Sequence, residues 1–301
     1  MIAGSCAAQT LVFEATSGAG GKKHVVLISG DEEYRSEESC PMLAKILNRH
    51  HGFKTTVLFA IHPNGGYIDS NYQNNIPGMG AIQTADVVII GTRFRDLPDN
   101  QLQPLLDHWN AGKPVIGFRT ATHAFRGESR LGGLSWNQFG LKILGQDWGG
   151  HYGKHKKQGA RGVIVETHQD HPILRSVADV FADSDVYGVE WVTEKNATIL
   201  LMGQVTETLL PDSAPVEGKQ LQPSSWLKEY TMPESEKTGT VFVRRWVPQR
   251  ISLAKIYAES SSMRRISCRV WKCPRRRMLN SWIHLIQAGI PSTKAKIIIK
   301  I

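Results

Sequence analysis

The sequence predicts an α/β fold in which a doubly wound, mostly parallel sheet carries helices on both faces. Short apolar runs alternate with stretches of helical periodicity, a pattern typical of right-handed strand–helix–strand units. The first run, His24–Ser29, contains four consecutive aliphatic residues, as expected of a strand buried on both faces. At 301 residues, the chain is long enough for a large domain of this kind.

The remaining elements follow in order along the chain. A helix over Met42–His50 and a second helix over Gln101–Trp109 place Leu and Ile at helical spacing. Between and after them lie further apolar runs, each short enough to be a strand. These predicted strands are Lys54–Ala60, Asp86–Gly91, Pro114–Phe118, Gly162–Glu166, Asp185–Val189, Ala197–Met202 and Ser225–Tyr230.

The net charge of +9 is concentrated at one end of the chain. Arg244–Ile301 contains 14 Lys and Arg residues and one acidic residue, Glu259, whereas the preceding residues contain 22 basic and 26 acidic ones. This change falls inside an apparent strand, Thr238–Val243. We therefore predict a lost base in the coding sequence near codon 243. Codons for the residues from Val243 onward can be chosen so that the same bases, read with a displacement of two, encode STMGATKDFF.

Two alternatives for the basic segment stay open. One is a genuine basic arm that contacts nucleic acid, and the other is an ordinary divergent ending. Resequencing the gene around codon 243 separates the frameshift from both alternatives, because an unbroken frame with these codons contradicts the frameshift. Nucleic acid is the less favoured partner, since the preceding residues are mildly acidic.

Composition also predicts the organisation of the chain. Residues 1–22 are rich in Gly, Ala and Ser and predict a flexible N-terminal stub. An α/β domain is predicted over residues 23–243, and residues 244–301 are expected to be a non-native, poorly ordered tail. The stub lacks a full signal peptide, and the location stays open between the cytoplasm and, if Ser5–Gln9 is the remnant of a processing site, export to the periplasm. No apolar run approaches the ~20 residues of a membrane helix, and four Cys residues are too few for a disulfide scaffold.

Polar side chains crowd the predicted carboxyl ends of three strands. In an open parallel sheet these ends meet at one edge, where ligands bind. Carboxylates and guanidinium groups there can bind the adjacent hydroxyls of a sugar, and Tyr34, Phe94 or Trp148 can stack on its face. An internal ion-pair network without a ligand is the alternative. The candidate substrate-binding residues are Asp31, Glu32, Glu33, Tyr34, Arg35, Arg93, Arg95, Asp96, Arg119, Thr122, His151 and His155.

Catalytic and metal-binding roles have weaker support in the sequence. Thr120 and His123 are the candidate catalytic residues, as a hydroxyl–imidazole pair with His123 at the rim of the site, but a binding role is favoured over catalysis. His151 and His155, with His123, could bind a metal if they lay on a helix. Neighbouring glycines favour a loop instead, so no metal and no cofactor are expected. Arg119 needs a carboxylate, for which we expect Asp31, Glu32 or Asp96.

Four segments together resemble the ThuA-like (trehalose utilisation) family: His24–Glu38, Thr92–Pro98, Gly117–Phe125 and His151–His155. The resemblance implies the flavodoxin-like fold of class I glutamine amidotransferases and a role in carbohydrate metabolism. The amidotransferase nucleophile motif, Gly-x-Cys-x-Gly, aligns with Gly117–Ala121. Arg119 stands in place of the Cys, so no glutaminase activity is expected. Family members continue after the last strand with Met-Gly-Ala and Asp-Phe, which the displaced frame supplies.

Three functions follow from these observations. The favoured one is a carbohydrate-metabolism protein that binds or processes a sugar or sugar derivative at the carboxyl ends of the parallel strands. A non-catalytic carbohydrate-binding or auxiliary protein is the alternative, and nucleic-acid binding through the basic tail is the third. The sequence leaves both catalysis and the oligomeric state open.

Overall fold

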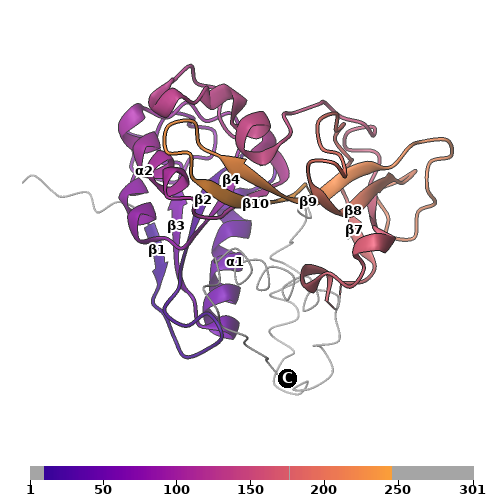
Figure 1. The fold of residues 1–301 in the computed structure, drawn as a ribbon, viewed down its shortest axis with the longest axis horizontal. Helices are drawn as coiled ribbons and strands as arrows, with labels where there is room; N and C mark the ends of the chain where they lie inside the picture. The colour runs from indigo at the N-terminus through magenta and orange to yellow at the C-terminus, as the bar shows by residue number, and fades with distance from the viewer. Residues whose placement is uncertain (1–9, 176, 246–301) are drawn as a thin grey trace, which may run out of the picture.

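The computed structural model describes residues 10–175 and 177–245, in which a mixed ten-stranded sheet carries helices on its faces (Figure 1). The strands lie in the order β1-β3-β2-β4-β5-β10-β9-β8-β6-β7. Two α-helices, α1 (Ser36–His51) and α2 (Asp99–Asn110), occur in these residues, together with one-turn helices such as Arg119–His123. The strands are β1 (Thr10–Phe13), β2 (His24–Gly30), β3 (Lys54–Phe59), β4 (Val87–Thr92), β5 (Val115–Phe118), β6 (Ala160–Ile164), β7 (Val180–Ala182), β8 (Thr198–Val205), β9 (Gln222–Thr231) and β10 (Thr238–Arg244).

Five of the strands form the parallel half of the sheet. β3, β2, β4, β5 and β10 are consecutive parallel neighbours. Among these five strands β2 comes first along the chain; β3 lies on one side of it, and β4, β5 and β10 lie on the other. The direction of winding therefore reverses beside β2. In open α/β sheets this is the position at which ligands bind.

The two faces of β2 carry separate cores. Val26 and Ile28 pack in one hydrophobic cluster with Leu105 of α2, whereas Val25 and Leu27 pack in the other with Leu47 of α1. Successive side chains of a strand point to opposite faces, so the two α-helices cover opposite faces of the sheet, as Figure 1 shows. Helices on both faces are thus present, as the alternation of elements predicts.

The second half of the sheet corrects the expectation of a mostly parallel arrangement. β10, β9, β8, β6 and β7 are antiparallel neighbours. For β9 and β10 the physical reason is the length of their connection: a short turn joins them, and a parallel connection needs a crossover of a dozen or more residues. Residues 185–189, predicted as a strand, form a loop with one isolated bridge between His151 and Tyr187.

The strands of the sheet extend beyond both boundaries of the domain predicted over residues 23–243. Thr10–Phe13 lies inside the segment predicted to be a flexible stub, yet it pairs with β3 at the edge of the sheet because its residues are suited to a strand. At the other end, β10 extends to Arg244, one residue into the predicted tail. The expected disorder of the tail, and its nucleic-acid alternative, fall on residues 246–301, outside the described part. Within the described part, no helix has the length and apolarity to cross a membrane.

Candidate functional site

The structure brings together the polar loops that follow β2, β4 and β5. Glu32, after β2, forms ion pairs with both Arg93 and Arg95, which follow β4. Arg93 also lies 3.2 Å from a carboxylate oxygen of Glu33. Because Glu32 and Glu33 are about one fifth exposed, this network lies at the boundary between the interior and solvent.

Arg95 is the structural anchor of this network. Its side chain is fully buried, and it donates hydrogen bonds to the carbonyl oxygens of Arg93 (2.8 Å), Ser70 (3.0 Å) and Tyr72 (2.9 Å). With Glu32 as its ion-pair partner, the guanidinium uses its donors within the protein. Arg95 therefore holds Glu32 in place, and we assign it no direct contact with a ligand.

Arg119 occupies the turn directly after β5 and is buried. Its guanidinium lies between the rings of Tyr34 and Tyr187, 4.1 and 4.2 Å from their centroids. It donates hydrogen bonds to the Tyr34 hydroxyl and to the Asp185 carbonyl oxygen, the latter at 3.1 Å. The nearest carboxylate is also that of Asp185, at 3.6 Å. The prediction that Asp31, Glu32 or Asp96 would pair with Arg119 is therefore wrong.

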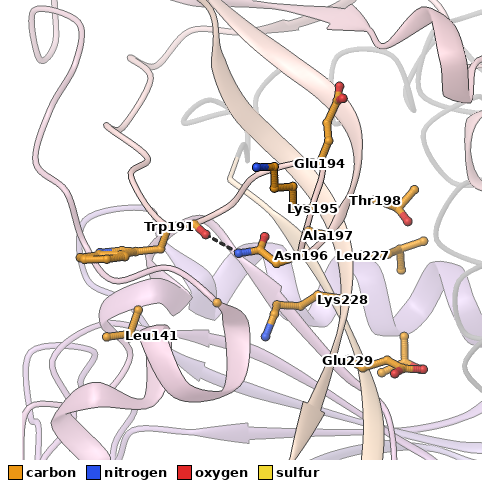
Figure 2. A pocket seen from close by; sticks show the side chains of 12 residues that line it. Leu141, Trp191, Glu194, Lys195, Asn196, Ala197, Thr198, Leu227, Lys228 and Glu229 are labelled. Carbon is orange, nitrogen blue, oxygen red and sulfur yellow. Dashed lines mark hydrogen bonds between the residues drawn. The ribbon is translucent and has the colours of Figure 1, made fainter.

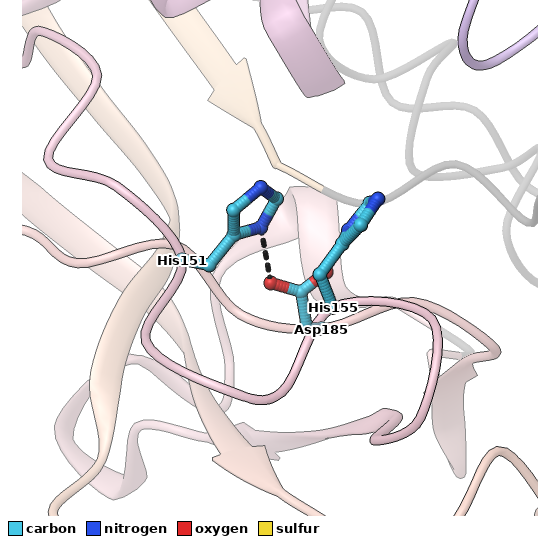
Figure 3. Close-up of side chains that lie close together, drawn as sticks. All are labelled: His151, His155 and Asp185. Atoms are coloured by element: carbon cyan, nitrogen blue, oxygen red, sulfur yellow. Dashed lines mark hydrogen bonds and ion pairs between the residues drawn. The ribbon is translucent and has the colours of Figure 1, made fainter.

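Asp185 contacts two histidines as well as Arg119, and Figure 3 shows His151 and His155 beside its carboxylate. One carboxylate oxygen lies 2.7 Å from Nδ1 of His151, and the other lies 3.3 Å from Nδ1 of His155. The second ring nitrogen of His155 lies 3.1 Å from Glu33. We call Glu32, Glu33, Arg93, Arg119, His151, His155 and Asp185 the strand-end cluster.

Asp31 is buried, and its burial and its hydrogen-bond partners have opposite effects on its pKa. Oδ1 accepts the backbone N–H groups of Glu33 and Tyr34, while Oδ2 faces the hydroxyl of Thr120. That hydroxyl also lies 3.0 Å from the carbonyl oxygen of Thr92 and has a single proton to donate. Burial raises the pKa of Asp31 to about 6 despite these hydrogen bonds.

Asp31→Asn is expected to reduce the pH dependence of stability between about pH 4 and pH 6. The folded protein keeps the Asp31 proton up to about pH 6, whereas the unfolded chain loses it near pH 3.8. Raising the pH through this window therefore favours unfolding, by about 3 kcal/mol at most. Urea titrations of both proteins at several pH values measure the difference. Asp107→Asn, an exposed control, leaves it unchanged; a pH-independent difference for Asp31→Asn contradicts the assignment.

An aromatic group lies beside the cluster. The indole of Trp148 is 41% exposed, and its ring centroid lies 5.2 Å from that of His123, 5.8 Å from that of His151 and 6.3 Å from that of Phe94. His123 itself is buried rather than at the rim. Burial, with smaller contributions from nearby cations, lowers its pKa to about 3, so its imidazole is neutral at physiological pH.

Several sequence-predicted residues lie apart from the cluster. Arg35 forms an exposed ion pair with Glu38 in the first turn of α1. Asp96 accepts a hydrogen bond from Asn74, at 3.4 Å. Thr122 is buried, and its hydroxyl lies 3.4 Å from Nδ1 of His123. These three positions therefore support the surrounding loops rather than the cluster itself.

Sequence reasoning missed two central residues, Asp185 and Tyr187. Both fall in a segment predicted as a strand, and neither has a local pattern that indicates its role. Asp185 meets Arg119 across 66 positions of the chain. The available signal was chemical rather than periodic: a buried Arg after a central strand requires an acidic partner, and Asp185 lies at the start of an apolar run.

Three of the six non-glycine residues with positive φ in the described part of the chain lie in the loops after the parallel strands. Arg35, Phe94 and Arg119 have φ values of 51°, 52° and 50°, in the left-handed region that non-glycine residues seldom adopt. Each follows a different parallel strand. Conformations of this kind persist where the surrounding structure holds them, and they cluster at functional sites.

A separate open cavity of about 760 Å³ lies away from the cluster (Figure 2). Its wall includes Trp191, whose side chain is 56% exposed, and Lys228 of β9. Burial lowers the pKa of Lys228. Figure 2 shows the Asn196 side chain bonded to the Trp191 carbonyl oxygen across this wall. None of the residues that line the cavity belongs to the strand-end cluster.

Comparison with known proteins gives similarity at the level of structure. No family model and no curated protein matches the chain. A solved structure described as a thua-like protein from Bacteroides uniformis ATCC 8492 shares 14% identity, over 74% of this chain and 81% of that one, with a TM-score of 0.45. A second, from Parabacteroides merdae ATCC 43184, shares 14% identity over 74% and 79%, with a TM-score of 0.46. The chain is similar to ThuA-like proteins.

A third structure, an exo-beta-1,4-mannosidase from Opitutaceae bacterium strain TAV5, shares 11% identity over 91% of this chain and 37% of that one. Its TM-score is 0.32.

Proposed function

We propose that this ThuA-like chain is a carbohydrate-metabolism protein that binds or processes a sugar or sugar derivative at the carboxyl ends of its parallel strands. One observation carries the proposal: the exposed Trp148 indole stands beside a group of ionic side chains that includes Glu33 and His151. Aromatic faces take the apolar face of a sugar ring, and charged groups bind its hydroxyls. Both components occur here within one site.

The position of the site supports the proposal. The parallel strands have the order 2-1-3-4-5 when they are numbered along the chain from β2, and this is the order of flavodoxin-like sheets. We infer a flavodoxin-like arrangement for this half of the molecule. In such sheets ligands bind beside the first strand, where the winding reverses. Glu32 and Arg93 follow the two strands that flank this point.

Glutaminase activity is not part of the proposal. Arg119 has a left-handed conformation in the turn after β5, the kind of strained turn that displays a nucleophile in other enzymes. A guanidinium ion is no nucleophile. Cys40, the one free cysteine of the described residues, is buried in α1, and burial raises the pKa of its thiol. Neither group can form the covalent intermediate of an amidotransferase.

The surroundings of Thr120 and His123, the two candidate catalytic residues, favour binding over catalysis. The hydroxyl of Thr120 is fully buried against Asp31 and the Thr92 carbonyl oxygen. His123 is buried among aromatic rings with a neutral imidazole. Neither side chain is placed to exchange protons with a ligand. These observations favour positioning roles for both and support the non-catalytic carbohydrate-binding alternative.

Trp148→Ala is expected to weaken sugar binding about tenfold, equivalent to about 1.4 kcal/mol. The reason is that the exposed indole supplies the apolar contact surface of the proposed site. Calorimetric titration of the full chain with a panel of disaccharides and sugar acids measures the affinity. Trp191→Ala removes another exposed indole, in the separate cavity, and serves as the matched control. If no sugar binds, or if the two variants lose affinity equally, the proposal fails.

A further inference from the structure

We propose that His151, His155 and Asp185 bind a divalent transition-metal ion, with zinc as the reference ion. Each side chain offers one ligand atom, and these atoms lie within 4.8 Å of one another. Figure 3 shows both imidazole rings beside the Asp185 carboxylate. This inference goes beyond the proposed function, because the ion binds to the protein alone and requires no sugar.

The distances suit a metal after small side-chain movements. Zinc lies about 2.0–2.2 Å from nitrogen and oxygen ligands, which places tetrahedral neighbours about 3.3 Å apart. Nδ1 of His155 is 3.3 Å from Asp185 already, whereas Nδ1 of His151 is 2.7 Å from it, a hydrogen-bond distance. An ion that replaces the proton of this hydrogen bond therefore requires the His151 imidazole to move by about half an ångström. Its side chain, about one third exposed, has room for this shift.

The surroundings of His155 have the organisation that metal-bound histidines require. A ligating His usually donates its other ring N–H to a carboxylate, which fixes the tautomer and orients the ring. Here Nδ1 of His155 faces Asp185, and Nε2 lies 3.1 Å from Glu33. Glu33 is held in turn by Arg93. This outer carboxylate is independent of the three ligands and supports the assignment.

Asp185 is held by the interior of the protein. Its side chain is 1% exposed, and its carbonyl oxygen accepts a hydrogen bond from Arg119. The Arg119 guanidinium lies 3.6 Å from the carboxylate and balances part of its charge. A buried carboxylate that contacts two imidazoles and one guanidinium has a fixed position before any ion arrives. Such preorganisation favours metal binding.

The donor set indicates the class of site. Two imidazoles and one carboxylate leave at least one coordination position open, as in catalytic rather than structural zinc sites. An ion with an open position can bind a sugar hydroxyl or polarise a water molecule. Trp148 lies next to His151, so the open position would face the proposed sugar site. The loop conformation that the glycines around His151 predict brings the histidines to Asp185 without a helix.

Zinc titration of the full chain tests the inference. After dialysis against a chelator, competition with a zinc-sensitive dye is expected to give one tight site per chain. His151→Ala is expected to weaken that site roughly 100-fold or more, and Glu33→Gln, which alters only the outer partner, about 10- to 100-fold. His171→Ala is the control for adventitious binding to loop histidines and should leave the affinity unchanged. Substitution of Co²⁺ should give the visible absorption bands of a tetrahedral ion.

Two outcomes overturn the inference: no tight zinc site in the wild-type chain, or unchanged zinc affinity in His151→Ala. Because His151 is partly exposed, this variant should fold normally, and its thermal unfolding checks that it does. Asp185→Asn is a second test that retains the volume of the side chain. Trp148→Ala should bind zinc like the wild type, so failure of sugar binding and failure of metal binding are distinguishable.

Discussion

Replacing Arg119 with Ala should lower the free energy of unfolding by about 3–5 kcal/mol. The guanidinium is completely enclosed between Tyr34 and Tyr187, and its loss leaves the buried Asp185 carboxylate without its cation. Removing one partner of a buried pair costs more than the pair contributes, because the remaining charge is desolvated. For a domain of this size, the melting temperature should fall by about 10 °C.

Arg161→Ala is the matched control for this prediction. Arg161 also pairs with an aspartate, Asp179, at 3.0 Å, but the two side chains are 30% and 75% exposed. An exposed pair contributes less than about 1 kcal/mol. Chemical unfolding of both variants compares them directly. Equal losses of stability would contradict the anchoring role of Arg119.

Replacing Arg245 with Met should raise the free energy of unfolding by about 1–3 kcal/mol. Arg245 is 1% exposed, and burial lowers its pKa to about 9. One nitrogen donates to the Gly188 carbonyl oxygen at 3.1 Å. Among the described residues, Nε and Nη2 of Arg245 have no hydrogen-bond partner, and no carboxylate forms an ion pair with it. Met has a similar volume and no charge to desolvate.

The same substitution at Arg93 should have the opposite sign, because Arg93 is paired with Glu32 and Glu33. Urea unfolding of both variants provides the comparison. A loss of stability in Arg245→Met would show that the guanidinium is well solvated or well paired in the folded chain, and would contradict the prediction.

The burial of Arg245 bears on the frameshift hypothesis. It and its neighbour Arg244 are both buried at the end of β10, and burial lowers the pKa of both. Charged side chains are seldom fully buried without partners, and Nε and Nη2 of Arg245 have no hydrogen-bond partner among the described residues. The displaced frame begins with Ser-Thr-Met, which carries no charge. The variant Arg245→Thr, which introduces the uncharged residue of the displaced frame, should therefore also be more stable than the wild type, as thermal unfolding can show.

The parallel half of the fold was predictable because its strands have a strong local signal. His24–Ser29 and Asp86–Gly91 are continuous apolar runs, and the structure places β2 and β4 there. Since parallel strands end at one edge, the proximity of Glu32 and Arg93 followed from topology. The antiparallel half was less predictable, because the connections between β6 and β7 and between β8 and β9 are long enough for either direction of pairing.

The site was predictable only in part. His151 and His155 were identified by residue type, but their partner Asp185 lies 34 and 30 positions away, respectively, and was assigned to a strand. His123 was expected at the rim because its place after β5 was known while its burial was not. Burial depends on Trp148 and Tyr187, which reach it from distant loops. Packing across the two halves of the chain has no local sequence signal.

Fluorine NMR of the full chain labelled with 5-fluorotryptophan can locate the sugar-binding site on the protein. The signal of Trp148 is identified by its absence in Trp148→Phe, and that of Trp191 by its absence in Trp191→Phe. During titration with a sugar that binds, we expect the Trp148 signal to move in proportion to occupancy while the Trp191 signal stays in place. Movement of the Trp191 signal alone would place the sugar in the separate cavity of Figure 2 and contradict a carbohydrate site at the strand ends.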